Sequence, residues 1–140
     1  LGVAVAMVFF VWIWVALALY RATFGDVELS PGAFLAELFT TAHGWTLILV
    51  GNLLGALFAL AILAGTAIAF PMLVDRRVSV ATAVATSLRT FAANPMPMLV
   101  WGVIVAGGLF IGAVPFLLGL LVVLPVLGHA TWHLYRRVVA

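Results

Sequence analysis

The chain has 140 residues, of which 67% are hydrophobic and only 7% charged, with a formal net charge of +2 and no cysteine. Soluble domains carry roughly 45–50% apolar and about 25% charged residues, so a soluble globular fold is excluded. The small, scattered positive charge excludes a nucleic-acid-binding surface. The lack of cysteine excludes disulfides and thiolate metal sites within this sequence. We therefore expect lipid to be the solvent of this chain.

The first predicted element is a membrane helix over about residues 1–21. Residues 1–20 contain no charge, and as a helix they would span ~30 Å, the thickness of the hydrocarbon core. Tyr20 and Arg21 mark its end at the interface. Because the chain opens inside this apolar run with Leu1 and not with methionine, we expect its natural N-terminus to be missing.

A polar stretch follows, and it contains a short amphipathic helix over about 31–42. Ser30 has the character of an N-cap, and Pro31 suits the first helical position. Phe34, Leu35 and Leu38 fall on one face. We predict that this helix lies on the membrane surface, with a docking surface for a partner as the alternative.

Residues 44–74 form the next apolar run, which is longer than one straight crossing requires. Trp45 marks the near interface, and Pro71 should bend or end the helix close to the far one. Small residues recur at a spacing of four in two stripes and predict close helix packing; the first consists of Gly51, Gly55 and Ala59, and the second of Ala61, Gly65 and Ala69. Asn52 lies beside the first stripe, and an amide in hydrocarbon needs a partner, for which we expect a neighbouring helix.

A second amphipathic helix is predicted over about 79–93. It follows the charged residues Asp75, Arg76 and Arg77, begins at the N-cap residue Ser79, and ends at Asn94-Pro95. Its apolar face carries Val80, Val84, Leu88 and Phe91, opposite Thr82, Thr86, Arg89 and Thr90. We predict an interfacial helix from which Arg89 reaches phospholipid phosphates.

The last apolar run, Met96 to Leu127, allows either one kinked crossing or two crossings joined by a turn at residues 112–115. The two long loops differ in charge: residues 21–43 carry one positive and three negative side chains (Arg21, Asp26, Glu28 and Glu37), and residues 75–95 carry three positive and one negative (Arg76, Arg77, Arg89 and Asp75). Because Lys/Arg excess marks the cytoplasmic side, residues 75–95 are expected inside. Two crossings, about 97–112 and 115–137, would then also return Arg136 and Arg137 to the inside.

The predicted architecture is therefore all-α. It is a single membrane domain over 1–140, a polytopic bundle of four membrane helices with two short interfacial helices. Gly108 and Gly112 are another expected packing pair. The residues expected to anchor the helices at the interfaces are aromatic or basic: Trp45, Arg76, Arg77, Arg89, Trp132, Tyr135, Arg136 and Arg137.

His129 and His133 are the candidate metal ligands. Four residues apart on a helix, they would point the same way and could chelate one ion, with Asp75 as the one carboxylate on the same side. They could not hold both axial positions of one haem. Alternatives are hydrogen bonding at the headgroup level and proton handling. No cofactor is predicted beyond this possible metal or haem site. No phosphate loop, paired carboxylates or Ser-His-Asp set can be assembled, so an enzyme is not expected.

The C-terminal half also carries a family resemblance. FPMLVDRRVSVATAVATSLRTFAANPMPMLVWG and, above all, GHATWHLYRR resemble an uncharacterised family of bacterial integral membrane proteins, a domain of unknown function in which some members bear the label cytochrome c oxidase subunit I. The resemblance covers about Ser30 to Val139. It implies a longer protein of roughly six helices, of which this chain is the C-terminal part. A haem-copper catalytic core needs more histidines than the three present here.

These observations favour a non-catalytic protein of the bacterial inner membrane with a cytoplasmic C-terminus. The expected partners are lipid and either other membrane subunits or the missing N-terminal half. The favoured role is an accessory or structural subunit of a respiratory or photosynthetic complex of the cytochrome oxidase type. The alternatives are a small-molecule transporter around Asn52, Pro71 and Pro125, and a metal- or haem-binding redox protein using His129 and His133.

Overall fold

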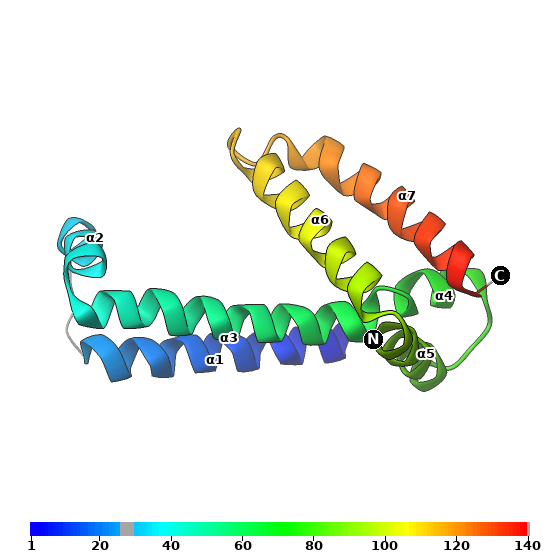
Figure 1. Cartoon of the computed structure of the whole chain (residues 1–140), viewed down its shortest axis with the longest axis horizontal. Helices are drawn as coiled ribbons and strands as arrows, with labels where there is room; N and C mark the ends of the chain where they lie inside the picture. The colour runs from blue at the N-terminus through cyan, green and yellow to red at the C-terminus, as the bar shows by residue number, and fades with distance from the viewer. Residues whose placement is uncertain (26–29, 140) are drawn as a thin grey trace. The chain divides into compact units, whose positions relative to one another are not determined.

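The computed structural model describes residues 1–25 and 30–139, and within them every regular element is a helix (Figure 1). The helices are α1 (Gly2–Phe24), α2 (Pro31–Thr40), α3 (Ala42–Thr66), α4 (Ala69–Asp75), α5 (Val80–Ala93), α6 (Pro95–Ala113) and α7 (Leu120–Val139). The predicted all-α class is confirmed. Asp26 and Glu28, which enter the charge argument, lie outside the described residues.

Three stretches of the described chain are long and apolar enough to cross a membrane. They are Gly2–Phe24, Ala42–Asp75 (α3 and α4 taken together) and Pro95–Ala113. The C-terminal half of α7 contains His129, His133, Arg136 and Arg137, and α7 is not among the three. The structure therefore supports a multi-pass membrane protein with three candidate spans.

The chain divides into two compact units, Leu1–Ala59 and Leu60–Ala140, which are described separately. In the first unit, α1 runs beside the N-terminal part of α3 (Figure 1). The aromatic rings of Tyr20 and Phe24 on α1 lie 5.7–6.1 Å from the ring of Phe34 on α2. These ring contacts hold α2 to the end of α1.

Side-chain hydroxyl groups cap the N-termini of α2 and α3 and define the junction between them. The Ser30 hydroxyl accepts the Ala33 N–H at 3.4 Å, and the Thr41 hydroxyl accepts the Gly44 N–H at 3.0 Å. Gly44 is buried against the backbone of Leu38, and a Cβ at this position would overlap the Leu38 carbonyl oxygen. Only glycine fits here, so this junction is sterically defined.

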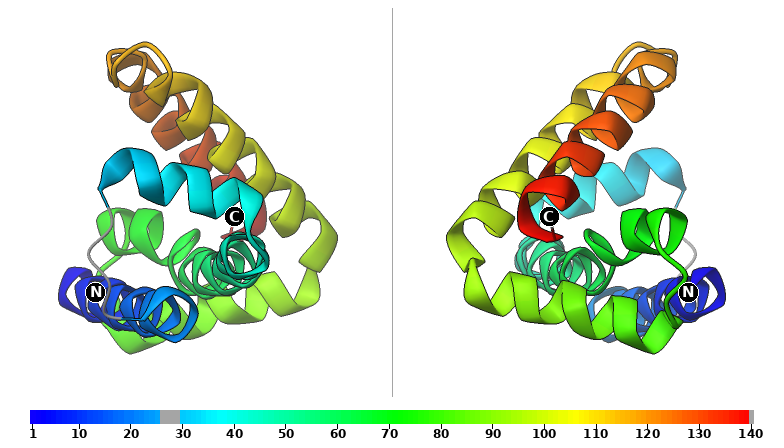
Figure 2. Two further views of the ribbon diagram at one scale, coloured as in Figure 1. Left: turned by 90° about the vertical axis from the view of Figure 1, so that its left-hand side faces the viewer. Right: turned by 90° about the vertical axis from the view of Figure 1, so that its right-hand side faces the viewer.

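In the second unit, α4 packs against α5 and α7, and α6 packs against α7. Helices α6 and α7 lie side by side in both views of Figure 2. The side chains that are almost completely buried (0–1% exposed) gather from α4, α5, the start of α6 and the end of α7: Ile68, Ala69, Ala83, Ser87, Met98 and Tyr135. The core of this unit is thus where four helices meet.

The helix predicted over 44–74 is two helices in the structure, with a break at Ala67–Ile68. Pro71 has no N–H to donate to the carbonyl of Ala67, four residues earlier, and its ring crowds that carbonyl. The predicted interruption by Pro71 is therefore present, and it lies one turn before the proline, where the missing hydrogen bond falls.

The predicted turn between the last two helices is present but longer than expected. It covers residues 114–119, and α7 begins at Leu120 and not at residue 115. Phe116 and Leu117 have φ of 49° and 66°, a left-handed conformation that ends a right-handed helix. Gly119 closes the turn, since a Cβ there would lie 2.8 Å from the Gly112 carbonyl oxygen.

Candidate functional site

The break between α3 and α4 is occupied by a side chain from another helix. In a continuous helix the N–H of Ile68 would donate to the carbonyl of Ala64. Here the Ser87 hydroxyl of α5 accepts the Ile68 N–H at 3.2 Å and donates to the Ala64 carbonyl at 2.7 Å. One hydroxyl therefore satisfies both backbone groups, and Ser87 itself is 0% exposed.

The face of α5 that packs inward consists of small residues. Ala83, Ser87 and Thr90 are the buried residues of this helix, whereas Val80 and Leu88 are 45% and 48% exposed. Val80 and Leu88, on the predicted apolar face of this interfacial helix, therefore lie outside the packed core, as expected of side chains that face lipid. In lipid, large apolar side chains gain nothing by leaving the surface, while small residues let backbones approach. The spacing of Ala83 and Ser87 was the signal that could have revealed this face.

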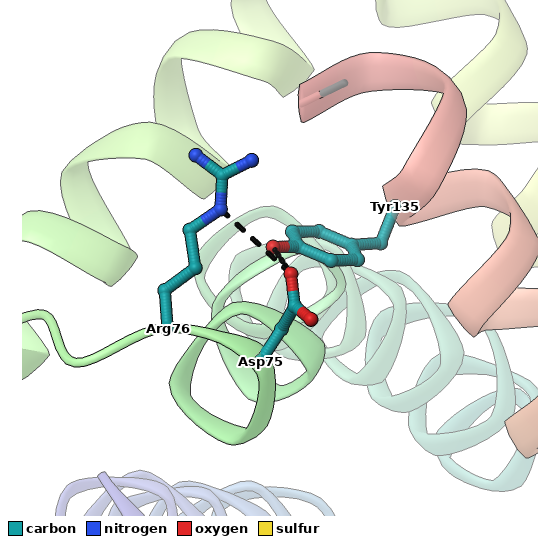
Figure 3. Close-up of polar contacts among 3 residues, drawn as sticks. All are labelled: Asp75, Arg76 and Tyr135. Carbon is teal, nitrogen blue, oxygen red and sulfur yellow. Dashed lines mark hydrogen bonds and ion pairs between the residues drawn. The ribbon is translucent and has the colours of Figure 1, made fainter.

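A second polar connection joins α4 to α7. The Tyr135 hydroxyl donates to Asp75 Oδ2 at 2.7 Å, and Arg76 Nε lies 3.7 Å from the same oxygen (Figure 3). Tyr135 is only 1% exposed, whereas the side chains of Asp75 and Arg76 are 31% and 48% exposed. A carboxylate accepting from a buried phenol positions α7 on α4 at the edge of the core.

Tyr135 thus differs from the anchor that the sequence predicted. An interface tyrosine was expected to face the headgroups, but its ring is buried and its hydroxyl bonds to Asp75. Trp132 lies beside it, with ring centroids 5.6 Å apart. The predicted basic anchors are exposed: Arg76, Arg77, Arg89, Arg136 and Arg137. Trp45 is 50% exposed and donates its indole N–H to the Phe39 carbonyl at 3.2 Å.

His129 and His133 lie on α7 and both are exposed. The Nδ1 atom of His129 lies 2.8 Å from the Pro125 carbonyl oxygen. A carbonyl can only accept, so Nδ1 is the donor in this bond, and Nε2 remains available. Across the described residues, no three His, Asp or Glu side chains come together as a metal site would require. Asp75, the one carboxylate predicted on the same side of the membrane, accepts a hydrogen bond from Tyr135.

The predicted packing glycines of α3 meet large side chains and not a closely approaching backbone. The nearest atom to a Cβ at Gly51 would be Leu19 Cδ2 at 3.6 Å, and at Gly55 it would be Trp12 Nε1 at 3.8 Å. Asn52 donates to the carbonyl of Ile48 in its own helix at 2.7 Å and not to a neighbouring helix as predicted. Ala59 is exposed. Gly65 has open space around it.

Gly108 and Gly112 lie against α7, as expected of a packing pair. A Cβ at Gly108 would contact Leu127 and Val123 at 3.5 Å, and one at Gly112 would lie 2.9 Å from Leu120 Cδ2. Gly102 was not singled out from the sequence. A Cβ there would lie 2.7 Å from Leu63 Cδ2, which places the end of α3 directly on α6.

The buried polar groups described above connect helices to one another, and their hydrogen-bonding atoms are used in these connections. Within the described part of the chain, every buried side-chain nitrogen or oxygen has a hydrogen-bond partner. The model of a family described as "predicted integral membrane protein (DUF2189)" matches residues 1–75. This is more than half of the chain. The chain belongs to the DUF2189 family.

No curated protein and no solved structure matches the chain. The DUF2189 match confirms a membrane protein family of unknown function, but over other residues than the sequence resemblance suggested. The match covers α1 to α4, and the resemblance was placed on about Ser30 to Val139. The GHATWHLYRR segment, its most specific part, lies beyond the matched residues.

Proposed function

We propose that this DUF2189 protein is a non-catalytic accessory subunit that packs against a larger membrane complex of the respiratory or photosynthetic, cytochrome oxidase type. The observation that carries the proposal is the use of its buried polar groups. Ser87 and Tyr135 connect helices to one another, and the resulting scaffold presents large apolar side chains outward. A fixed scaffold of this kind suits a structural role.

The proposal includes a topology in the bacterial inner membrane. Four membrane-embedded helices (α1, α3 with α4, α6 and α7) are accompanied by α2 and α5 at the two interfaces. Residues 75–95 and the C-terminus are cytoplasmic, because the arginines gather there. The exposed side chain of Arg89 can reach lipid phosphates on that side.

The test is mild detergent extraction of a tagged chain from its native membrane, followed by identification of the co-purifying proteins. We expect one membrane complex at fixed stoichiometry. As a control, the extract from cells with the tagged chain is mixed with an extract from untagged cells grown on a different isotope. A protein that carries the isotope of the untagged cells but co-purifies with the tag must have bound after extraction. Recovery of the chain without a stoichiometric partner would contradict the proposal.

A second candidate, a small-molecule transporter, is favoured by a groove in the first unit. The groove is lined by residues of α1 and α3, including Trp12, Gly51, Asn52 and Gly55. The amide oxygen of Asn52 could orient a polar solute there. Loss of uptake in Asn52→Leu, with uptake preserved in the matched variant Thr46→Val on the same helix, would support transport over the structural role.

A further inference from the structure

The turn between α6 and α7 contains no polar side chain. Its sequence over residues 114–119 is Val-Pro-Phe-Leu-Leu-Gly. Phe116 is 95% exposed, and Val114, Leu117 and Leu118 are 62–69% exposed. A turn of this kind that meets water is normally built from Gly, Asn, Asp and Ser. This one presents only hydrocarbon.

Most backbone N–H groups of the turn are paired without water. Five N–H groups at the turn donate to carbonyl oxygens of the turn or of the end of α6 at 2.9–3.2 Å: Val114 to Phe110, Phe116 to Val114, Leu117 to Ala113, Leu118 to Pro115 and Leu120 to Leu117. The N–H of Gly119 makes no such backbone bond. Pro115 has no N–H to satisfy. In a bilayer, non-helical backbone that faces lipid is excluded because its polar groups are unpaired. Because the backbone bonds pair the N–H groups of this turn apart from that of Gly119, they greatly lower the cost of placing it in lipid.

The two ends of the α6–α7 hairpin differ in polarity. The end at the turn remains apolar on both helices, where Phe110, Ile111, Leu121 and Val122 are 67–75% exposed. The opposite end carries Asn94 before α6 and the histidines and arginines of α7. A hairpin crossing the whole membrane would carry polar or belt residues at both ends. This hairpin carries them at one.

The length of α6 agrees with this contrast. Its 19 residues rise ~28 Å, against a hydrocarbon core of ~30 Å. Since α6 starts at Pro95, directly after the polar end, Ala113 does not reach beyond the opposite edge of the core. Any tilt of the helix would leave its end deeper.

We propose that the turn 114–119 stays among the lipid acyl chains of the leaflet opposite the arginine-rich end and does not emerge into water. The α6–α7 pair is then an intramembrane hairpin anchored from one side. This inference rests on the proposed topology, because the depth of the turn is defined relative to the cytoplasmic residues 75–95.

The test uses single-cysteine variants of the full chain, which has no cysteine of its own. Phe116→Cys and, as a second turn variant, Leu118→Cys are exposed to a membrane-impermeant maleimide in intact cells, in opened membranes and after detergent denaturation. Gly32→Cys on α2 and Ala81→Cys on α5 are the matched controls for the two aqueous sides, since both positions are exposed. We expect the turn cysteines to react only after denaturation. Gly32→Cys should react in intact cells, and Ala81→Cys only in opened membranes.

A second measurement identifies what covers the turn. Turn variants labelled with an environment-sensitive fluorophore are reconstituted into vesicles that contain lipids with a nitroxide on the acyl chain or on the headgroup. Stronger quenching by the acyl-chain nitroxide than by the headgroup nitroxide is expected. Protection from maleimide without quenching by either lipid would mean that protein covers the turn, and it would overturn the proposal.

The outcomes separate this proposal from the topology. Labelling of Phe116→Cys or Leu118→Cys in intact cells, with both controls as expected, would overturn the intramembrane turn and leave the topology standing. Reversed accessibility of Gly32→Cys and Ala81→Cys, with the turn still protected, would overturn the orientation and support the buried turn.

Discussion

The junction of α2 with α3 and the junction of α3 with α4 are both breaks in helical structure, but they are stabilised differently. At the first, Thr41 caps its own helix and Gly44 fits against nearby backbone, so every contact is local in sequence. At the second, the satisfying group is Ser87, which lies 19 and 23 residues away from its two partners. The local cap at Thr41 defines only where α3 begins. The Ser87 hydroxyl, in contrast, also determines that α5 packs against the break between α3 and α4.

The largest effect is expected from Ser87→Ala, which removes the distant group. The Ala64 carbonyl and the Ile68 N–H lose their partner inside the core, and each unsatisfied buried group costs about 1–3 kcal/mol. We expect a loss of about 2–4 kcal/mol, measured by unfolding in mixed micelles with increasing SDS. The control Ser79→Ala removes an exposed N-cap and should cost about 1 kcal/mol. Equal losses in both variants would contradict the special role of Ser87.

Gly44→Ala tests the local junction. A Cβ at this position overlaps the Leu38 carbonyl, so α2 must shift at a cost of about 1–3 kcal/mol. Limited proteolysis between α2 and α3 should become faster, while the second unit keeps its protection. The matched variant Gly32→Ala has open space around it and should cleave at the wild-type rate; faster cleavage there would mean that any added methyl group loosens α2.

Tyr135→Phe removes the hydrogen bond between α7 and α4 without changing the shape of the core. Because the carboxylate of Asp75 is 31% exposed and can take water in its place, we expect only about 1 kcal/mol. Hydrogen exchange at the end of α7 should accelerate. Asp75→Asn keeps an acceptor for the phenol and should lose less than Tyr135→Phe. The opposite ranking would show that charge, and not the hydrogen bond, holds α7.

The smallest effect is expected from Asn52→Leu. Its amide bonds within its own helix to Ile48 and is exposed, so we expect a change within about 0.5 kcal/mol in the same SDS titration. A loss similar to that of Ser87→Ala would reveal a partner for Asn52 supplied by another helix, as the sequence first predicted.

Much of the fold could be predicted because hydropathy and helix signals are local. The apolar runs, the caps at Ser30 and Ser79 and the break near Pro71 all follow from neighbouring residues, and the structure has helices close to the predicted bounds. The buried face of α5 could not be predicted by the same reasoning. In lipid the large apolar residues carry no information about which face is inside, and the Ser87 contacts connect residues far apart in sequence.

The candidate site was less predictable for the same reason. Asp75 and Tyr135 are 60 residues apart. Taken alone, the position of each at the end of an apolar run indicates only that it lies at the membrane interface. The histidine spacing on α7 predicted a metal site that no third described ligand completes. Spacing within one helix shows which side chains share a face, but only the packing of helices shows what that face meets.

The hydroxyl in the helix break has a consequence for synthesis of the chain. When residues 42–75 enter the membrane, Ser87 has not yet docked against them, so the Ala64 carbonyl and the Ile68 N–H have only each other. We therefore expect the nascent segment to insert as a straighter rod and to bend once α5 docks. The Ser87→Ala variant, which cannot form these bonds, should show a longer distance between spectroscopic labels at residues 60 and 74 than the wild-type protein does.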